Sequence, residues 1–198
     1  LLLDTEILRH RAEVELFPRH GGEFSWEDKM AVIGTSFAFT AHYFAERLVR
    51  PLIEGEALVH EMIEIMHAEL QADVEGRPGA IELVRRLTGR TRLGLASNSP
   101  RLLVDTALRT AGLTDAFEVI VTSDDVEHAK PAPDLYLLAC ERLGVAPSDA
   151  LALEDSPSGV AAAKAAGLTC IAVPQFAETD VSEADRVIDS LEELLAEA

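Results

Sequence analysis

The chain has 198 residues and a formal net charge of -18 at pH 7, with 17 Lys and Arg against 35 Asp and Glu. This excess of acid argues against nucleic acid or an anionic membrane as the main partner, because both reward basic side chains. The apolar fraction of 48% is ordinary for a globular protein, and the length suits one domain or one domain with a small insert.

Membrane and disulfide features are both missing from the sequence. No apolar run approaches the ~18 residues that a membrane span requires. Cys140 and Cys170 stand in apolar runs, and neither has a partner at the spacing of a metal site. We interpret both as reduced core residues, which indicates a reducing compartment and hence the cytoplasm.

The first third of the chain, from Asp4 to Val74, has a helical pattern throughout. Ser25 followed by Asp28 is typical of a capping box at a helix start. A break at Gly34 predicts a new helix opening at Thr35 or Ser36. The segment 56–74 carries apolar residues at helical spacing, namely Leu58, Met62, Ile65, Met66 and Leu70.

After Arg77, short apolar strands alternate with helices. This alternation predicts a parallel sheet covered by helices on both faces. Such sheets bind ligands at the carboxyl ends of their strands. We expect a helix capped by Ser99, a helix from Pro133 to Gly144 and a helix from Ser156 to Gly167. The predicted strands lie in the segments 92–97, 117–123, 150–155, 168–173 and 186–188.

Two of the predicted strand ends carry groups that suit a phosphate. Ser97 and Asn98 stand between a strand and a helix start, where a hydroxyl and backbone amides are offered to an anion. Lys130 follows another strand, and Pro131 restricts it to an extended backbone. A lysine so placed can neutralise a phosphate or a carboxylate.

A third strand end carries an acid pair. Glu154 and Asp155 directly follow the apolar strand "LAL", and two carboxylates in this position suit a hard divalent cation, Mg²⁺ first. Together, a hydroxyl, a lysine and an acid pair at three strand ends are the parts of a magnesium-assisted phosphoryl-transfer site.

Three segments resemble the second, third and fourth motifs of the haloacid dehalogenase-like hydrolases. They are "LASNSP", "KPAPDLY" and "LEDSPSGV", with 33 residues from Ser97 to Lys130 and 25 from Lys130 to Asp155. "LLLDTE" resembles the tail of the first motif. The resemblance implies a doubly wound, Rossmann-like α/β core over residues 1–8 and 76–198, with an inserted helical cap over residues 9–75.

The resemblance also implies a mechanism. A first-motif aspartate attacks phosphorus and forms an aspartyl-phosphate, and a second aspartate handles protons. Ser97 and the Asn98 backbone would hold the phosphoryl oxygens, and Lys130 would offset negative charge. Asp155 would bind Mg²⁺, with Glu154 as a co-ligand or a hydrogen-bonding neighbour of the ligand. The substrate would be a small phosphorylated metabolite, a sugar phosphate or similar, and the enzyme a phosphoric monoester hydrolase.

Both first-motif aspartates would precede Leu1. We therefore expect roughly ten more residues before it in the natural protein, forming a central strand and its turn. Without them the 198-residue chain is expected to be inactive, and the strands at 92–96 and 150–154 should not pair directly.

Other interpretations remain open at this stage. A dehalogenase is disfavoured by the metal-binding acid pair. A β-phosphoglucomutase-like mutase would carry an arginine in the segment resembling "FSWEDKM", where this chain has Trp26. A non-catalytic binding protein would lack the upstream aspartates. Trp26, Arg47 and Arg50 are candidates for substrate contacts from the cap, but neither the substrate nor the oligomeric state can be predicted.

Overall fold

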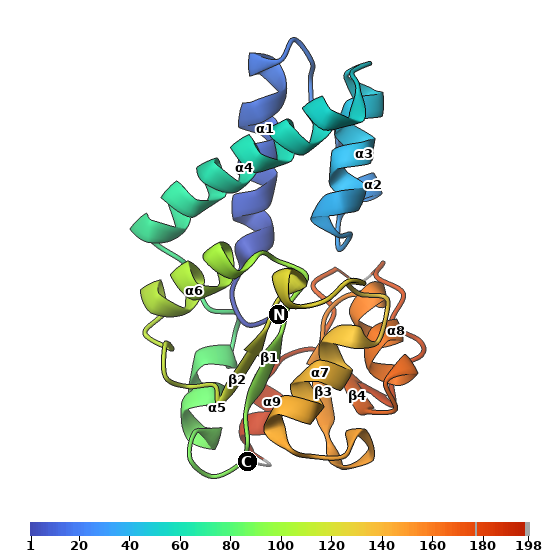
Figure 1. Cartoon of the computed structure of the whole chain (residues 1–198). Helices are drawn as coiled ribbons and strands as arrows, with labels where there is room; N and C mark the ends of the chain where they lie inside the picture. Colours follow the sequence, from blue (N-terminus) through green and yellow to red (C-terminus); the bar gives the residue numbers. More distant parts are fainter. Residues whose placement is uncertain (177, 197–198) are drawn as a thin grey trace.

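The computed structural model describes residues 1–176 and 178–196 (Figure 1). Among the residues described, five helices precede the first strand, and strands and helices then follow to the end. The elements are α1 (Thr5–Arg19), α2 (Trp26–Val32), α3 (Phe37–Arg47), α4 (Leu52–Ala72), α5 (Ala80–Leu87), β1 (Gly94–Ala96), α6 (Arg101–Thr110), β2 (Val119–Val121), η1 (Ser123–Asp125), α7 (Asp134–Leu143), η2 (Pro147–Asp149), β3 (Leu151–Glu154), α8 (Pro157–Ala165), β4 (Thr169–Ala172), β5 (Arg186–Val187) and α9 (Glu192–Leu195).

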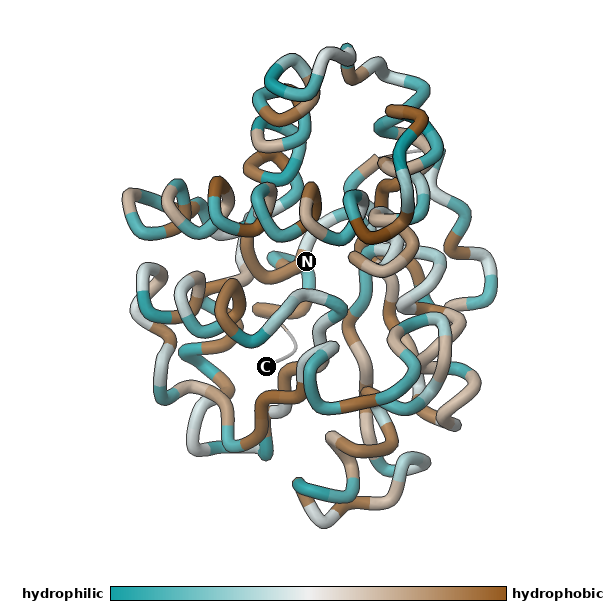
Figure 2. The backbone as a smooth tube through the Cα atoms, turned by 45° about the horizontal axis from the view of Figure 1, so that its top comes forward, coloured by the Kyte–Doolittle hydropathy of each residue, from teal (hydrophilic) through white to brown (hydrophobic). Residues whose placement is uncertain are grey.

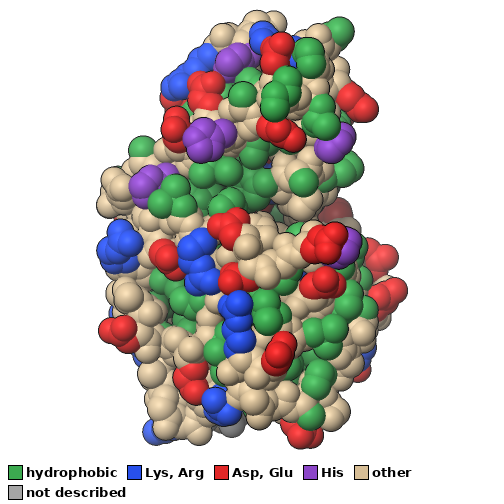
Figure 3. Space-filling view, in the orientation of Figure 1, with side chains coloured by type: hydrophobic (Ala, Val, Ile, Leu, Met, Phe, Trp, Pro, Cys, Tyr) green, Lys and Arg blue, Asp and Glu red, His purple; other side chains and the backbone are tan. Residues whose placement is uncertain are grey.

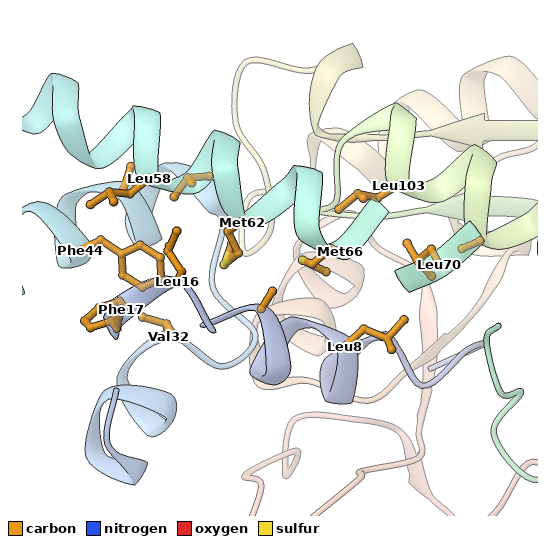
Figure 4. Packing of buried hydrophobic residues seen from close by; sticks show 14 of the residues in the cluster. Leu8, Leu16, Phe17, Val32, Phe44, Leu58, Met62, Met66, Leu70 and Leu103 are labelled. Atoms are coloured by element: carbon orange, nitrogen blue, oxygen red, sulfur yellow. The ribbon is translucent and has the colours of Figure 1, made fainter. Parts of the chain in front are cut away.

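Helices α1 to α4 form a separate helical layer, here called the cap, above the rest of the molecule (Figure 1). Polar and apolar residues alternate along α4 (Figure 2), and its apolar side packs against α1 and α3. Met62 and Met66 point into the space between α4 and α1 (Figure 4). The rings of Phe17 and Phe44 meet edge to face at 4.9 Å. The predicted helical pattern is confirmed, and α4 starts four residues before the predicted segment.

The predicted helix starts in the cap are confirmed by their hydrogen bonds. The Ser25 hydroxyl accepts from the Asp28 amide, and the Asp28 carboxylate accepts from the Ser25 amide. Ser36 caps α3 by accepting from the Phe39 amide. These bonds satisfy backbone donors that a helix leaves unpaired at its start.

Two antiparallel segments connect the cap to the rest. Leu3 and Gly76 form a bridge, and the Asp4 amide donates to the Glu75 carbonyl at 2.9 Å. Since α1 begins at Thr5, the predicted start of the cap at residue 9 falls inside this helix. On the other side, Leu103 of α6 joins the apolar cluster of the cap, so the cap also rests on α6 (Figure 4).

The α/β part has the predicted parallel sheet. β1 pairs with β2, and β3 pairs with β4, which pairs with β5, all in parallel. Helices α7 and α8 pack on one face, against Ala152 and Cys170, while α5 and α9 pack on the other, against Ile171. The fold is therefore a doubly wound, Rossmann-like α/β core with a helical cap.

The sheet is in two pieces. β1 and β3 are not hydrogen-bonded neighbours in the part of the chain described. The expectation that these two strands do not pair directly is thus met. A cavity of about 1420 Å³ lies along both of them, lined by residues 93–97 on one side and 150–155 on the other. It continues to the cap helices, where α1 and α2 contribute to its wall.

One predicted cap is wrong. Ser99 does not cap α6, which begins at Arg101 with Pro100 in the capping position. The Ser99 amide instead donates to the Ser97 hydroxyl oxygen at 3.1 Å, and the Arg101 amide donates to the Asp124 carboxylate at 2.8 Å. An acid from η1 therefore takes the place of a local cap, which the sequence pattern could not reveal.

Both cysteines are free and buried, as expected of core residues. Burial raises the pKa of the Cys170 thiol to about 11 and also raises that of Cys140. Among the residues described, no helix has the length and apolar character needed to cross a membrane. On the face shown in Figure 3, apolar side chains gather over α4, where the cap meets the α/β part.

Candidate active site

The predicted polar residues meet at one edge of the sheet. Ser97 follows β1, Lys130 follows β2 and η1, and Asp155 follows β3. All three line the same cavity, together with Asn98 and Glu154. This arrangement follows from the topology, because parallel strands present their carboxyl ends at the same edge.

Lys130 lies at the centre of this group. Its ammonium donates to the Ala96 carbonyl at 3.0 Å and to Glu154 Oε1 at 2.5 Å. The side chain is only 9% exposed. Because Ala96 ends β1 and Glu154 ends β3, this one ammonium connects the two pieces of the sheet. A buried cation between two strand ends is well placed to meet an anion in the cavity.

The Asn98 side chain fixes the Lys130 loop. Its Oδ1 accepts from the Lys130 amide at 2.8 Å, and its Nδ2 donates to the Lys130 carbonyl at 3.2 Å. The sequence predicted a phosphate contact from the Asn98 backbone, and it did not reveal this second role. No local pattern could have shown it, because the partners are 32 positions apart.

Two hydrogen bonds orient Ser97 at the end of β1. Its Oγ accepts the Ser99 amide at 3.1 Å, and its own amide donates to the Val121 carbonyl at 3.0 Å. The first contact fixes the orientation of the oxygen, and the second continues the pairing of β1 with β2. Since a hydroxyl can donate while it accepts, Ser97 can still donate to an anion in the cavity.

Glu154 is buried and held on both carboxylate oxygens. Oε1 accepts from Lys130 and from the Tyr136 hydroxyl, each at 2.5 Å, and Oε2 accepts from the Asp155 amide at 3.1 Å. Gly159 makes this position possible, since a Cβ there would lie 1.9 Å from Oε2. The glycine in "LEDSPSGV" therefore provides the space that the buried carboxylate occupies.

Tyr136 is a site residue that sequence reasoning missed. The Lys130 ammonium lies 4.7 Å from the centre of its ring, and its hydroxyl reaches Glu154. Burial, then the charge and the hydrogen bond of Glu154, raise the pKa of the Tyr136 phenol well above its usual value. The phenol is therefore protonated and is the donor in this bond. Its position in "KPAPDLY", six residues after Lys130, was the available signal.

Asp155 stands in positive surroundings. Its Oδ2 is 3.3 Å from Nη1 of Arg77, another residue the sequence did not single out. Burial opposes ionisation of Asp155, whereas the positive charges of Arg77 and Lys130 act to lower the pKa of this carboxyl. The carboxylate is ionised at neutral pH.

The acid pair fits Mg²⁺ in the chemistry of its donors. Asp155 offers a carboxylate at the cavity that already binds the Arg77 guanidinium. Magnesium is typically bound through one or two protein carboxylates, with water and substrate phosphate as its other ligands. The residues described include no cluster of three or more candidate metal ligands.

The three cap candidates have different positions. Trp26, at the first turn of α2, lines the cavity and is 62% exposed. Arg47 binds the Asp28 carboxylate at 2.8 Å, and Arg50 binds Glu54 at 2.9 Å. Neither arginine is among the residues that line the cavity. The structure thus brings Trp26 to the site and leaves both arginines elsewhere in the cap.

Arg9 and Glu6 line the cavity from α1 instead. The Arg9 guanidinium binds Glu13 at 3.0 Å and the Thr40 hydroxyl at 2.7 Å, while Lys29 binds both Glu6 and Glu13. Two acids and two bases therefore balance one another in the wall of the cap. Helical spacing alone did not distinguish these residues from a solvated helix face.

Comparisons with known proteins agree with this geometry. The haloacid dehalogenase-like hydrolase family matches residues 7–167. The Bacillus subtilis protein YhcW is 38% identical over 175 residues, which cover 88% of this chain and 79% of that protein. The fructose-1-phosphate phosphatase YqaB of Escherichia coli is 30% identical over 172 residues, covering 87% and 90%.

Solved structures give the same result. A mutant of CbbY from Rhodobacter sphaeroides, in complex with xylulose-(1,5)bisphosphate, superposes with a TM-score of 0.87 and 31% identity, covering 98% of this chain and 91% of that one. These matches agree with the residues at the strand ends and with the helical cap. The chain belongs to the haloacid dehalogenase-like hydrolases.

Proposed function

We propose that the protein is a magnesium-dependent phosphatase that acts on a small phosphorylated metabolite. The observation that carries this proposal is the meeting of Ser97, Lys130 and Asp155 at one cavity from three separate strand ends. A hydroxyl, a buried ammonium and an ionised carboxylate in this arrangement suit the charge of a transferring phosphoryl group.

Phosphate binding would fall to Ser97, Asn98 and Lys130. The Ser97 hydroxyl and the Asn98 backbone amide would donate to phosphoryl oxygens. The Lys130 ammonium would offset the negative charge that these oxygens carry. The two hydrogen bonds from the Asn98 side chain support this role, since they hold the Lys130 backbone at a fixed distance from the turn after β1.

Magnesium would be held by Asp155, with Glu154 close behind it. When bound, the ion would supply electrophilic stabilisation of phosphoryl oxygens. Glu154 would act through its hydrogen bonds, because both of its oxygens already accept from protein donors. This favours the interpretation of Glu154 as a neighbour that orients the site over that of a direct co-ligand.

The nucleophile would come from a strand preceding Leu1. The cavity between β1 and β3 supports this, because apolar side chains of both strands, including Leu95 and Leu153, line it where a buried sheet would continue. A strand there would pair with both neighbours and bring its carboxyl end beside Ser97, Lys130 and Asp155. An aspartate at that end would attack phosphorus, and a second one nearby would transfer the proton.

A small phosphate ester fits the cap side of the cavity. Trp26 stands where a β-phosphoglucomutase-like mutase is expected to carry an arginine, which supports hydrolysis over transfer to a second phosphate-bearing position. The phosphatase YqaB and the bisphosphate-bound CbbY are relatives whose ligands are sugar phosphates. We accordingly propose a sugar phosphate or a compound of similar size as the substrate.

The buried thiols suit a protein of the cytoplasm. Cys140 and Cys170 are free, and burial raises the pKa of both, which keeps them protonated and slow to oxidise. In a reducing compartment, both cysteines would serve only to pack the core.

The test is a screen of the natural full-length protein against a panel of small phosphate esters. Phosphate release is measured with Mg²⁺, with EDTA, and after Mg²⁺ is added back. We expect at least one ester to be hydrolysed, loss of activity in EDTA and recovery with Mg²⁺. Folded protein that releases no phosphate from the whole panel, or whose turnover survives EDTA, would contradict the proposal.

A further inference from the structure

The contacts of Tyr136 suggest a role beyond packing. This side chain is 8% exposed, and it lies in the first turn of α7, six positions after Lys130. Its ring faces the Lys130 ammonium at 4.7 Å, and its hydroxyl donates to Glu154 Oε1 at 2.5 Å. The phenol and the ammonium therefore bind the same carboxylate oxygen.

Sharing that oxygen has a consequence for Lys130. An ionised carboxylate only accepts, and an ammonium has three hydrogens and accepts nothing. Two of these hydrogens are directed to Ala96 and Glu154. Among the residues described, the third is directed to the Tyr136 hydroxyl oxygen at 3.4 Å, which is a long contact. It is the hydrogen that an anion in the cavity can take.

The Tyr136 hydrogen bond also weakens the hold of Glu154 on the lysine. A carboxylate oxygen that accepts a phenol hydrogen carries less unsatisfied charge than one bound by the ammonium alone. Without the phenol, Glu154 would attract the ammonium more strongly and neutralise more of its charge. Less of that charge would then be felt by a phosphoryl group.

We propose that Tyr136 is a positioning residue that shares Glu154 with Lys130 and thereby keeps the lysine charge available to the phosphoryl group. The proposal rests on the proposed phosphatase function for its kinetic consequence. The structural claim concerns Lys130 alone: the Tyr136 hydroxyl, and not its aromatic ring, determines how strongly Glu154 binds the Lys130 ammonium.

The chain offers a matched control, because it has two tyrosines and both donate to a buried carboxylate. The Tyr43 hydroxyl donates to Asp28 at 2.7 Å inside the cap, and neither residue is among those that line the cavity. Y136F and Y43F each remove one hydroxyl from one carboxylate and keep the ring. Only the first removal takes place beside Lys130.

The experiment compares wild type, Y136F and Y43F in the natural full-length protein. Three quantities are measured at fixed Mg²⁺: the melting temperature, the affinity for inorganic phosphate by calorimetry, and kcat and KM for the best ester of the screen. We expect Y136F to weaken phosphate binding about tenfold and to lower kcat/KM by a similar factor, as a lost charge-assisted contact would. Y43F should lower the melting temperature and leave both other quantities within twofold.

A second comparison uses Glu154→Gln, which removes the charge that the phenol shares. Adding Y136F to this variant should change phosphate affinity less than twofold, because no carboxylate remains to retain the lysine. An undiminished tenfold effect in that background would overturn the proposal.

The outcomes separate this inference from the proposed function. Wild type that hydrolyses an ester, with Y136F equal to it in phosphate affinity and kcat/KM, overturns the inference and leaves the function intact. Wild type that hydrolyses nothing overturns the function. The inference is then decided by phosphate affinity alone: a tenfold loss in Y136F supports it, and equal affinity contradicts it. Loss of the fold in Y136F would assign the phenol a structural role and also overturn it.

Discussion

The cap and the α/β part each contain a carboxylate bound by a tyrosine and a cation. In the cap, Asp28 accepts from Tyr43 at 2.7 Å and from Arg47 at 2.8 Å. In the α/β part, Glu154 accepts from Tyr136 and from Lys130, each at 2.5 Å. The residue types and the distances are nearly the same, yet only the second group borders the cavity.

The difference lies in what surrounds the cation. The Arg47 side chain is 44% exposed and ends in solvent, whereas that of Lys130 is 9% exposed and ends between two strand ends. The cap group joins two neighbouring helices, α2 and α3. The Lys130 group joins β1, α7 and β3, which are far apart in the sequence. A carboxylate that binds a tyrosine and a cation therefore does not identify an active site by itself. The distinguishing feature is its position at the cavity on the sheet edge.

The largest expected effect tests the α/β side of this comparison. Asp155→Asn should lower magnesium-dependent kcat about 1000-fold in the natural full-length enzyme, because a hard cation loses its charged ligand. The melting temperature should fall little, since the amide keeps the shape of the side chain. Turnover equal to wild type at limiting Mg²⁺ would remove Asp155 from the metal site.

The next prediction compares the two cations directly. Lys130→Met should lower kcat/KM about 100-fold, a magnitude typical for loss of one charge-stabilising group. Arg47→Met, the matched change in the cap, should leave kcat/KM within twofold. Steady-state kinetics on the same ester would measure both. Equal effects of the two changes on kcat/KM would mean that a position at the cavity does not make Lys130 more important for activity than Arg47.

Much of the fold could be predicted because the signals were local. Ser25 and Asp28 stand three positions apart and form the predicted capping box, and Gly144 ends α7 with a positive φ of 67° as its residue type suggests. The alternation of strands and helices after Arg77 likewise depends on neighbouring residues. Ser99 was mispredicted because Asp124, 23 positions after Arg101, satisfies the helix start from outside.

The site was predictable only where a strand end marked it. Ser97, Lys130 and Asp155 each follow a strand directly or through one loop, so topology brings them together. Tyr136, Arg77 and Arg9 lie on helices or connecting segments, where an isolated polar residue is ordinary. Their proximity to the cavity depends on how the cap and α7 pack, and a linear pattern carries no record of that packing.

A substitution at Asp28 in the cap is expected to lower the free energy of unfolding without lowering activity. Asp28→Asn removes a buried carboxylate that accepts from Ser25, Tyr43 and Arg47. Hydrogen bonds to a charged group are each worth about 1.5–3 kcal/mol, and partial compensation by the amide leaves an expected loss of about 2 kcal/mol. Urea unfolding measures this loss. An unchanged urea midpoint together with a reduced kcat/KM would mean that the Asp28 group serves activity and not stability.

The smallest effect concerns pH, and its sign follows from the Asp28 carboxyl. Burial raises the pKa of Asp28, but hydrogen bonds from the Ser25 backbone, Tyr43, the Ser25 hydroxyl and Arg47 outweigh it and lower the pKa from 3.8 to about 2. A carboxyl with a depressed pKa in the folded state stabilises the fold above its unfolded pKa. This stabilisation is lost as pH falls through the folded value.

Between pH 6 and pH 3 this loss amounts to about 1 kcal/mol, because the unfolded Asp28 takes up its proton in that range and the folded one mostly does not. Asp28→Asn has no proton to take up, so the difference in unfolding free energy between wild type and this variant should shrink by about 1 kcal/mol from pH 6 to pH 3. Asp125 in the α/β part, whose pKa is also lowered to about 2, provides the matched variant Asp125→Asn, and the same shrinkage is expected there. Urea unfolding of all three proteins at both pH values is the measurement. A constant difference for Asp28→Asn beside a shrinking one for Asp125→Asn would mean that the hydrogen bonds of the cap do not lower the pKa of Asp28.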